Sequence, residues 1–371
     1  MGKFGKKNEV KLDPLAYNIG LLGESGIGKS TIIKEICETL AGPEGYIALD
    51  IGKEDGHAAI QDIVTEQVPD WATLTEIFDD IIENKETDYP DLKVVVIDTY
   101  DEFCNIAEQE AIRLWNKGRD EKAKSINGAW GGFGKGLDKT IEIMLDTLWE
   151  LKKVGVSFII VAHTKKKDVE DVKSEEQYSV LTSNISQKYF NAIKTKLHFL
   201  GLAYVDREIV KEKSSKKDKD GNYIMKGKIV GESRVINFRD DTYSVDGKSR
   251  FADIVDQIPF TSEAFIKAMQ DAILKEQSKS GISVEVAKKK QAKEAKAKKA
   301  EAKSYSELKK RNHFDLEANE KYIDIIREKF IDADDEVKLE VRTIMANYEI
   351  ENFKNPEVST EGLKAIVNLL I

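Results

Sequence analysis

Short apolar runs alternate with longer amphipathic stretches over residues 13–270 of the chain. The runs fit buried strands, and the stretches between them place apolar residues at helical spacing. This alternation predicts βα units, and therefore an α/β fold with a mostly parallel sheet. The predicted strands are Asn18–Leu22, Tyr46–Asp50, Lys93–Asp98, Val156–Ala162 and Leu197–Val205. The predicted helices are Lys29–Leu40, Trp71–Glu83 and Leu137–Val154.

Residues 204–238 follow a different pattern, in which polar and apolar positions alternate on both sides of a polar centre. Asp220-Gly221 lies at that centre and is a typical two-residue turn sequence. We therefore predict two antiparallel strands joined at this turn.

Charge divides the chain into four segments: a polar, basic lead over residues 1–12, the α/β core over 13–270, a basic linker over 271–311 and an acidic module over 312–371. From Lys275 to Arg311 there are 13 Lys/Arg against 5 Glu, and large apolar residues are almost missing. Such a segment cannot bury a core, so it is either a solvated helix or a disordered linker. The last segment carries 14 Asp/Glu against 7 Lys/Arg, and its apolar spacing predicts a small helical module.

Composition narrows the classes of function. The 371 residues carry a formal net charge of −9, which excludes a uniformly basic nucleic-acid binder but not a local basic surface. The two cysteines, Cys37 and Cys104, give neither a metal-ligand spacing nor a disulfide framework. The lead has no apolar stretch of a secretory signal, and no window of about 18 apolar residues occurs. We expect a cytoplasmic protein without membrane contact.

A phosphate-binding loop is predicted after the first strand. The sequence Gly23-Glu24-Ser25-Gly26-Ile27-Gly28-Lys29-Ser30 fits the P-loop pattern G-x-x-x-x-G-K-[ST], and Thr31 follows it. The glycines allow the backbone N–H groups to surround a phosphate, and the following helix directs its positive end at the anion. Lys29 should reach the β- and γ-phosphates, and Ser30 should bind Mg²⁺. The alternative, a glycine-rich turn with a fortuitous lysine, does not explain the apolar strand and amphipathic helix on either side.

A second acidic ligand is expected at the end of the strand Lys93–Asp98. Four consecutive β-branched residues precede Asp98, which is typical of a fully buried parallel strand. Asp98 should therefore emerge at the carboxyl edge of the sheet, near the P-loop, and hold Mg²⁺. Asp98 as a simple helix N-cap is the alternative. The sequence predicts an ATP and Mg²⁺ site with Ser30 and Asp98 as the metal ligands.

Several classes of nucleotide enzyme are disfavoured. The guanine-binding pattern N-K-x-D fails because Arg119 stands at the fourth position of Asn116-Lys117-Gly118-Arg119. Thr99, not glutamate, follows Asp98, which argues against ATPases whose catalytic base directly follows the metal-binding aspartate. We find no lid with paired arginines of the kind that kinases of small metabolites carry.

The pieces GESGIGKST, VVVIDTYDEF, VSFIIVAHTKKK and RVINFRDDTYSVDGKSRF occur in this order over residues 13–260. Together they resemble the RecA-like ATPases of bacteriophages that include single-strand annealing recombinases. The resemblance implies that Asp98 coordinates Mg²⁺, with Thr99 as its hydroxyl neighbour, and that His163 senses the γ-phosphate. It also implies a homo-oligomer with ATP at subunit interfaces, in which Lys248-Ser249-Arg250 reaches the neighbouring site and Arg250 acts in trans. A phage-encoded protein would act in the host cell cytoplasm.

The catalytic base is left open between two residues. The family places a glutamate after the second strand, and here Glu54 follows that strand one or two residues from the usual place. Asp50, at the end of the same strand, is the rival. Either residue can instead be an ordinary turn residue, in which case ATP would be hydrolysed slowly.

Two segments are candidates for single-stranded DNA binding. Asn116–Lys135 combines cations with Trp130 and Phe133 among glycines, so phosphates and a stacked base could both find partners. Lys165–Lys188 mixes both signs of charge. The basic tract Lys288–Arg311 could add sequence-independent binding to DNA phosphates. The alternative is a solvated mobile loop for each of the first two segments and a soluble linker for the basic tract.

Three hypotheses of function follow from these residues. The first is a DNA-stimulated, RecA-like ATPase that acts on single-stranded DNA in recombination, annealing or replication. The second is an ATP-gated interaction module whose acidic C-terminal part recruits a replication or recombination partner. The third is a hexameric helicase or helicase-loader motor.

Overall fold

The computed structural model describes residues 8–170, 177–217, 223–239, 248–331, 333–354 and 356–371. The chain divides into two compact units. Unit 1 comprises Met1–Thr75, Asp91–Lys152 and Val156–Ala295. Unit 2 comprises Glu76–Pro90, Lys153–Gly155 and Lys296–Ile371.

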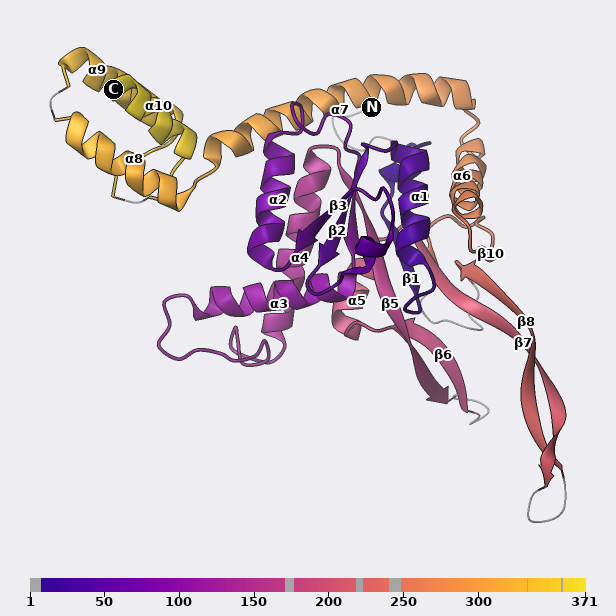
Figure 1. Cartoon of the computed structure of the whole chain (residues 1–371). Helices are drawn as coiled ribbons and strands as arrows, with labels where there is room; N and C mark the ends of the chain where they lie inside the picture. Colours follow the sequence, from indigo (N-terminus) through magenta and orange to yellow (C-terminus); the bar gives the residue numbers. More distant parts are fainter. Residues whose placement is uncertain (1–7, 171–176, 218–222, 240–247, 332, 355) are drawn as a thin grey trace. The chain divides into compact units, whose positions relative to one another are not determined.

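A ten-stranded sheet, counted over the described residues, forms the centre of unit 1 (Figure 1). Six neighbouring strands are parallel, which confirms the predicted α/β fold class. In spatial order they are β7 (Phe199–Lys217), β1 (Ile19–Gly23), β5 (Ser157–Glu170), β4 (Val94–Asp98), β2 (Tyr46–Ile51) and β3 (Thr65–Val68). The antiparallel strands are β8 (Tyr223–Asn237) beside β7, β10 (Gln257–Pro259) beside β8, β9 (Lys248–Ser249) beside β7 and β6 (Gln177–Ser183) beside β5.

Both faces of the parallel sheet are covered, and this explains its continuous apolar strands. On one face, Leu21 of β1 and Val96 of β4 join Ile33 and Met269 in a single core. On the other face, the Phe158 ring of β5 packs against Trp149 with centroids 5.6 Å apart. Every residue of β1 and β4 is buried. A strand that is buried on both sides has no polar positions, as the sequence pattern indicated.

The helices connect the strands and form these two outer layers. Those that begin in unit 1 are α1 (Lys29–Ala41), α2 (Trp71–Glu83), α3 (Tyr100–Asn116), α4 (Lys135–Lys153), α5 (Gln187–Lys194), α6 (Ser262–Ser278) and α7 (Val284–Asn312). Short 3₁₀ turns lie at Pro14–Ala16 and Gly56–Ala59. The predicted helix Trp71–Glu83 has the observed bounds of α2, and the other two predicted helices differ by one or two residues at their ends.

The long helix α3 was not predicted, although its start carries a recognisable signal. Thr99 is the N-cap, and its hydroxyl accepts a hydrogen bond from the Glu102 backbone N–H at 3.5 Å. Thr99 and Glu102 have the spacing of a capping box, which stabilises the first turn of a helix. This cap starts α3 directly after Asp98, so the helix begins at the edge of the predicted metal site.

Lys165–Lys188 was predicted to be a loop, and this prediction is wrong for most of its described residues, which form strands. β5 continues past Ala162 to Glu170 and pairs antiparallel with β6, from Thr164↔Ser183 to Glu170↔Gln177. Cross-strand pairing thus orders a charged segment that sequence polarity alone assigns to a loop. The predicted hairpin of residues 204–238 is present as β7 and β8, and its expected turn at Asp220-Gly221 lies outside the described residues.

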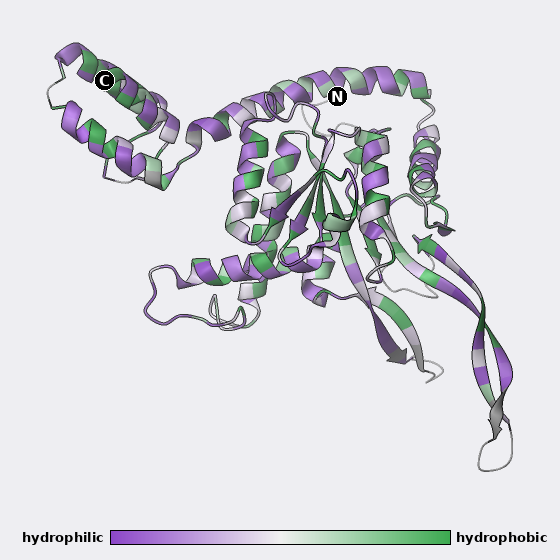
Figure 2. Ribbon diagram, in the orientation of Figure 1, coloured by the Kyte–Doolittle hydropathy of each residue, from purple (hydrophilic) through white to green (hydrophobic). Residues whose placement is uncertain are grey.

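Of the two possibilities left open for the basic segment, the structure forms a helix, α7, with 29 residues. Gln291 accepts a hydrogen bond from the Leu12 N–H at 3.0 Å and donates one to the Val10 carbonyl at 2.8 Å. Glu294 forms an ion pair with Lys11 at 2.6 Å. The first half of α7 is therefore tied to the N-terminal segment of unit 1, and hydrophilic positions recur along the whole helix (Figure 2).

Unit 2 contains a small bundle formed by α8 (Leu316–Lys329), α9 (Asp335–Asn347) and α10 (Thr360–Leu370). Ile326, Val341, Leu363 and Ile366 are fully buried in its core. The bundle therefore has an apolar core of its own. No helix in the described part of the chain combines the length and the apolar character needed to span a bilayer.

Candidate active site

The P-loop connects the end of β1 to the start of α1 in the way the motif predicts. Gly26 and Gly28 adopt positive φ angles of 76° and 106°, which other residues rarely adopt. Gly28 is the N-cap of α1 and provides no side-chain cap for the helix. A helix N-terminus without such a cap, reached through left-handed glycines, is a ready site for a phosphate group.

The remaining P-loop residues have distinct positions. Ile27 is buried, Glu24 is half-buried, and Ser25 and Thr31 are exposed. The Ile27 carbonyl accepts a hydrogen bond from Nη1 of Arg234 on β8 at 3.2 Å. Arg234 was not singled out in the sequence, because its partner is a backbone atom and no side-chain pattern marks it. The P-loop is thus held from a second strand.

Lys29, the first residue of α1, points back along the loop. Its Nζ donates hydrogen bonds to the carbonyls of Gly23 at 3.1 Å and Glu24 at 3.0 Å. Burial lowers the pKa of Lys29, whereas the charges of Asp98, Asp101 and Glu54 raise it. A buried ammonium held only by carbonyl oxygens in this arrangement is suited to exchange them for phosphate oxygens.

Ser30 and Asp98 lie in contact, although Ser30 is in α1, directly after β1, and Asp98 ends β4, which is not a neighbour of β1 in the sheet. β5 lies between β1 and β4, and the parallel register brings all three carboxyl ends to one edge. There, Ser30 Oγ donates a hydrogen bond to Asp98 Oδ2 at 2.6 Å. A hydroxyl and a carboxylate are the hard oxygen ligands that Mg²⁺ prefers, with phosphate and water filling its other positions. These residues fit the predicted metal.

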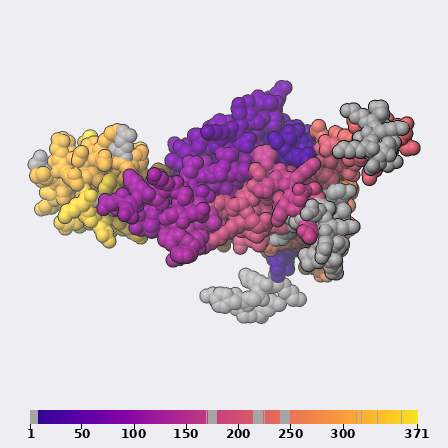
Figure 3. Space-filling view, turned by 90° about the horizontal axis from the view of Figure 1, so that it is seen from below, coloured from indigo at the N-terminus to yellow at the C-terminus, as the bar shows by residue number. Residues whose placement is uncertain are grey.

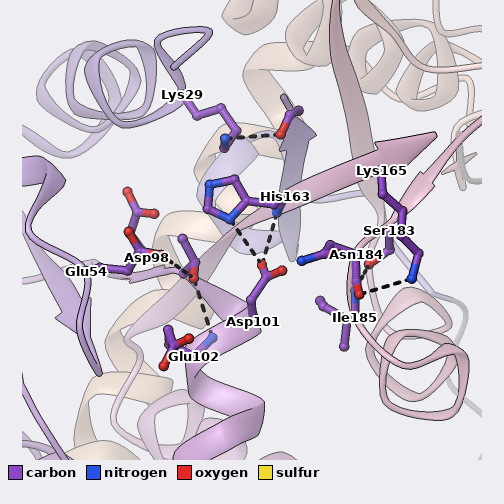
Figure 4. A network of polar contacts seen from close by, with 12 residues as sticks. Lys29, Glu54, Asp98, Asp101, Glu102, His163, Lys165, Ser183, Asn184 and Ile185 are labelled. Carbon is purple, nitrogen blue, oxygen red and sulfur yellow. Dashed lines mark hydrogen bonds and ion pairs between the residues drawn. The ribbon is translucent and has the colours of Figure 1, made fainter. Parts of the chain in front are cut away.

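His163 lies at the same edge and is joined to a residue that the sequence did not mark. The register pairs His163 of β5 with Gly23 of β1, so His163 is on the strand beside the P-loop strand, as expected. Its backbone N–H donates to Asp101 Oδ2 at 3.0 Å, and its Nδ1 is 3.8 Å from the same oxygen (Figure 4). Asp101 Oδ1 is buried and accepts no hydrogen bond from the described residues. One carboxylate oxygen is thus left for water or ligand.

The two candidates for the catalytic base lie in different surroundings. Glu54 is half-buried, and its Oε1 is 3.5 Å from Thr99 Oγ1, so it lies at the site with Lys29 (Figure 4). Asp50 is buried; its Oδ2 accepts a hydrogen bond from Gln67 Nε2 at 2.9 Å, and its Oδ1 lies 2.9 Å from His57 Nδ1. Burial raises the pKa of Asp50, and the charge of His57 lowers it. Both oxygens of Asp50 are engaged in the fold, which favours Glu54.

His57 is a buried residue that sequence reasoning missed. Its Nδ1 contacts Asp50 at 2.9 Å and Thr65 Oγ1 at 2.7 Å, and its Nε2 is 3.1 Å from Asp98 Oδ2. The imidazole therefore fixes the carboxylate of the proposed metal ligand from behind. No motif marks this role, because His57 follows β2 and reaches Asp98 only through the strand order of the sheet.

Arg250 lies at the opposite edge of the sheet from the P-loop. β9 pairs with the first residues of β7, where Ser249 faces Phe199. Arg250 donates its backbone N–H to the His198 carbonyl at 2.9 Å, and its guanidinium donates to the Thr195 carbonyl. The Lys248 side chain lies outside the described parts. Arg250 therefore lies near the amino ends of the parallel strands, whereas the P-loop follows the carboxyl end of β1.

The two candidate aromatic residues between α3 and α4 differ in burial. Trp130 is half-buried, donates its indole N–H to the Ala111 carbonyl at 3.0 Å and packs against Trp115. Trp130 therefore packs against the rest of this segment. Phe133 has a relative exposure of 103% and is the free aromatic of this segment.

A family model described as an AAA domain matches residues 15–251, which is more than half of the chain. The chain belongs to the AAA domain family. The matched region begins just before β1, contains the P-loop, Asp98 and His163, and ends just after Arg250. No curated protein sequence matches the chain.

Membership in the AAA domain family agrees with the geometry of the site. The P-loop, the buried Lys29 and the Ser30–Asp98 pair provide what a nucleoside triphosphate requires. The chain is therefore an AAA-type P-loop protein, and its family indicates ATP binding and hydrolysis. The C-terminal bundle lies outside the matched AAA domain.

Proposed function

We propose that this AAA domain protein is a Mg²⁺-dependent ATPase that acts on single-stranded DNA in phage-type recombination, annealing or replication. The observation that carries the proposal is the course of α3. This helix begins at Tyr100, beside Asp98, the proposed metal ligand, and ends at Asn116, where the segment with Phe133 begins. One rigid helix thus connects the nucleotide site to a candidate DNA-binding loop.

Phe133 has the properties of a stacking platform. It lies in Trp130-Gly131-Gly132-Phe133-Gly134, where every residue has a positive φ, and its ring is exposed to solvent. The part of the chain around residues 100–150 is drawn in purple to magenta in the space-filling view (Figure 3). A ring held out by a glycine-rich turn can stack on any base. Cations of the same segment would meet the phosphates of the strand: Lys117, Arg119, Lys122, Lys124 and Lys135.

The residues of the site divide the work of hydrolysis. Lys29 would bind the β- and γ-phosphates, and Ser30 and Asp98 would hold Mg²⁺, which neutralises charge on the phosphates when bound. Glu54 would orient the attacking water and accept its proton. His163 would contact the γ-phosphate and transmit its loss to Asp101 at the start of α3, because His163 N–H donates to that carboxylate. DNA affinity would then depend on the nucleotide.

Arg250 and its position at the far edge of the sheet support assembly. We propose a homo-oligomer in which subunits pack head to tail and each ATP site receives Arg250 from its neighbour. An arginine supplied in trans stabilises charge that develops on the transferred phosphoryl group. The whole protein would function in the cytoplasm of the host cell.

The test of single-strand binding is a variant of the stacking residue. Phe133→Ala should weaken binding of a fluorescent oligodeoxynucleotide about 5- to 100-fold, since one base–aromatic stack contributes about 1–3 kcal/mol. Phe314→Ala removes another exposed phenylalanine, in unit 2, and is the matched control. Equal affinities of the two variants, measured by fluorescence anisotropy with a non-hydrolysable ATP analogue, would contradict the proposed loop.

The C-terminal bundle supports a second candidate, an ATP-gated module that recruits a protein partner. The bundle has its own core, yet Ile331 and Leu339 are 76% and 65% exposed. Apolar side chains beside a net negative charge suit a partner with an apolar and basic surface. Tight ATP binding with negligible hydrolysis, whether or not DNA is present, would favour this candidate.

A further inference from the structure

The hairpin of β7 and β8 extends far beyond the sheet. β7 pairs with β1 only from Phe199 to Ala203, whereas its pairing with β8 continues to Lys217↔Tyr223. Residues 209–217 alone span roughly 30 Å at about 3.3 Å per residue. We call residues 209–217 and 223–230 the arm; it leaves the carboxyl edge of the sheet as a two-stranded ribbon (Figure 1).

The arm exposes apolar side chains that no core covers. Ile209 and Ile229 face each other across the two strands and are 59% and 53% exposed. Met225, further along the same face, is 50% exposed. Green apolar positions persist along the ribbon in Figure 2. An exposed ribbon with several aliphatic residues is an unusual surface for a monomer and indicates a binding role.

The arm is also basic in an acidic protein. Residues 209–217 and 223–230 contain six lysines and one acidic residue, whereas the whole chain has a net charge of −9. Register places Lys211 and Lys213 on the face of Ile209, and Lys226 on the opposite face. One acidic group, Glu212, is already paired with Lys228 at 3.0 Å. Positive charge is thus present on both faces of the ribbon.

We propose that the arm binds duplex DNA by lying in a groove. The major groove of B-DNA admits a two-stranded β-ribbon, and lysines on both faces of a ribbon in this position meet the phosphates on the two walls. Aliphatic side chains such as Ile209 and Ile229 can contact thymine methyl groups. Tyr223 is the one aromatic residue of the arm, so the arm lacks the stacked rings that favour unpaired bases. This duplex site is distinct from the proposed single-strand site at Phe133 and does not depend on it.

The test compares two triple variants in binding a short blunt-ended duplex. Lys211→Gln/Lys213→Gln/Lys226→Gln should bind at least about tenfold more weakly than the unmodified protein at low salt. The slope of log affinity against log salt concentration should fall in magnitude by about 2 to 3, because up to three phosphate contacts are lost. The control, Lys338→Gln/Lys354→Gln/Lys364→Gln, changes charge equally in the C-terminal bundle and should bind as the unmodified protein does.

Three results would overturn the proposal. In the first, the unmodified protein does not bind duplex DNA. In the second, the two triple variants bind the duplex with equal affinity. In the third, the arm variant binds the duplex as the unmodified protein does but differs from it in self-association. The last result would make the arm a contact between copies of the chain. Single-strand-stimulated ATP hydrolysis, measured in the same preparations, should be unchanged in the arm variant. If single-stranded DNA does not stimulate ATP hydrolysis by the unmodified protein, that result counts against the proposed function and not against duplex binding by the arm.

Discussion

At the scale of single residues, the site depends on charges that are held close together with little solvent. Lys29 is buried among Asp98, Asp101 and Glu54, and it donates only to backbone carbonyls. The ammonium is therefore positioned before ATP arrives. Its hydrogen bonds can be transferred to phosphate oxygens without a large change in side-chain position.

The lowered pKa of Lys29 predicts how ATP binding depends on pH. Burial is the largest cause of the lowering, so Lys29 loses its proton at a lower pH than an exposed lysine. Affinity for a fluorescent ATP analogue should therefore begin to fall, as the pH rises, below the pKa of an exposed lysine, about 10.4. Lys29→Arg, whose guanidinium stays protonated, should bind more weakly but with little pH dependence. Parallel pH profiles of the two proteins would contradict a role for the Lys29 charge.

The two carboxylates after β2 predict different effects of amide substitution. Glu54→Gln should lower kcat about 100-fold or more and leave ATP affinity unchanged, because only the proton acceptor is lost. Asp50→Asn should mainly lower the free energy of unfolding, since it removes the charge that His57 contacts. Steady-state ATP hydrolysis and urea unfolding separate these effects. A larger loss of turnover in Asp50→Asn would reverse the assignment of the base.

At the scale of secondary-structure elements, buried strands and amphipathic helices were predictable, because apolar runs indicate the strands and apolar residues at helical spacing indicate the helices. The run Val94–Asp98 and the helix Trp71–Glu83 are examples. β3 was missed because three of its four residues are exposed and none of those is apolar. The extension of β5 beyond Ala162 was missed because pairing with β6, and not hydrophobicity, orders it. Elements formed by partners far apart in sequence leave little local signal.

The residues of the candidate site were also predictable only where a local sequence pattern marks them. Motif spacing identified Gly23, Lys29 and Ser30, and the end of an apolar strand identified Asp98. His57 and Asp101 were not identified, because their roles arise from contacts between separate strands and helices.

The turn after β2 shows how one element constrains another. Gly52 has a φ of 70°, and a Cβ added there would lie 2.5 Å from Glu102 Oε2 of α3. Gly52→Ala should therefore lower the free energy of unfolding by about 1 kcal/mol for the backbone and further for this contact. Gly118→Ala is the matched control, since its φ is 71° and no atom lies within 4 Å of the added Cβ. Equal losses in urea unfolding would show that α3 accommodates the methyl group freely.

At the scale of the whole molecule, the position of Arg250 predicts complementation between inactive subunits. Arg250→Ala and Lys29→Ala should each lose most ATP turnover, the former by about 10³-fold or more, as is typical of an arginine supplied in trans. In a mixture, a Lys29→Ala subunit still supplies Arg250 to the intact P-loop of an Arg250→Ala subunit. With random head-to-tail assembly, about a quarter of the interfaces are complete, and a similar fraction of activity should return. A mixture as inactive as its components would exclude the trans role.

The central claim joins ATP hydrolysis to single-stranded DNA, and the rate of hydrolysis with and without that DNA tests it most directly. We expect strong stimulation at low salt that decreases at moderate salt, because phosphate contacts are replaced by counterions. Stimulation should disappear in Phe133→Ala and persist in Phe314→Ala. Hydrolysis that is indifferent to single-stranded DNA at both salt concentrations, while ATP still binds, would contradict the account and favour an ATP-gated module that recruits a protein.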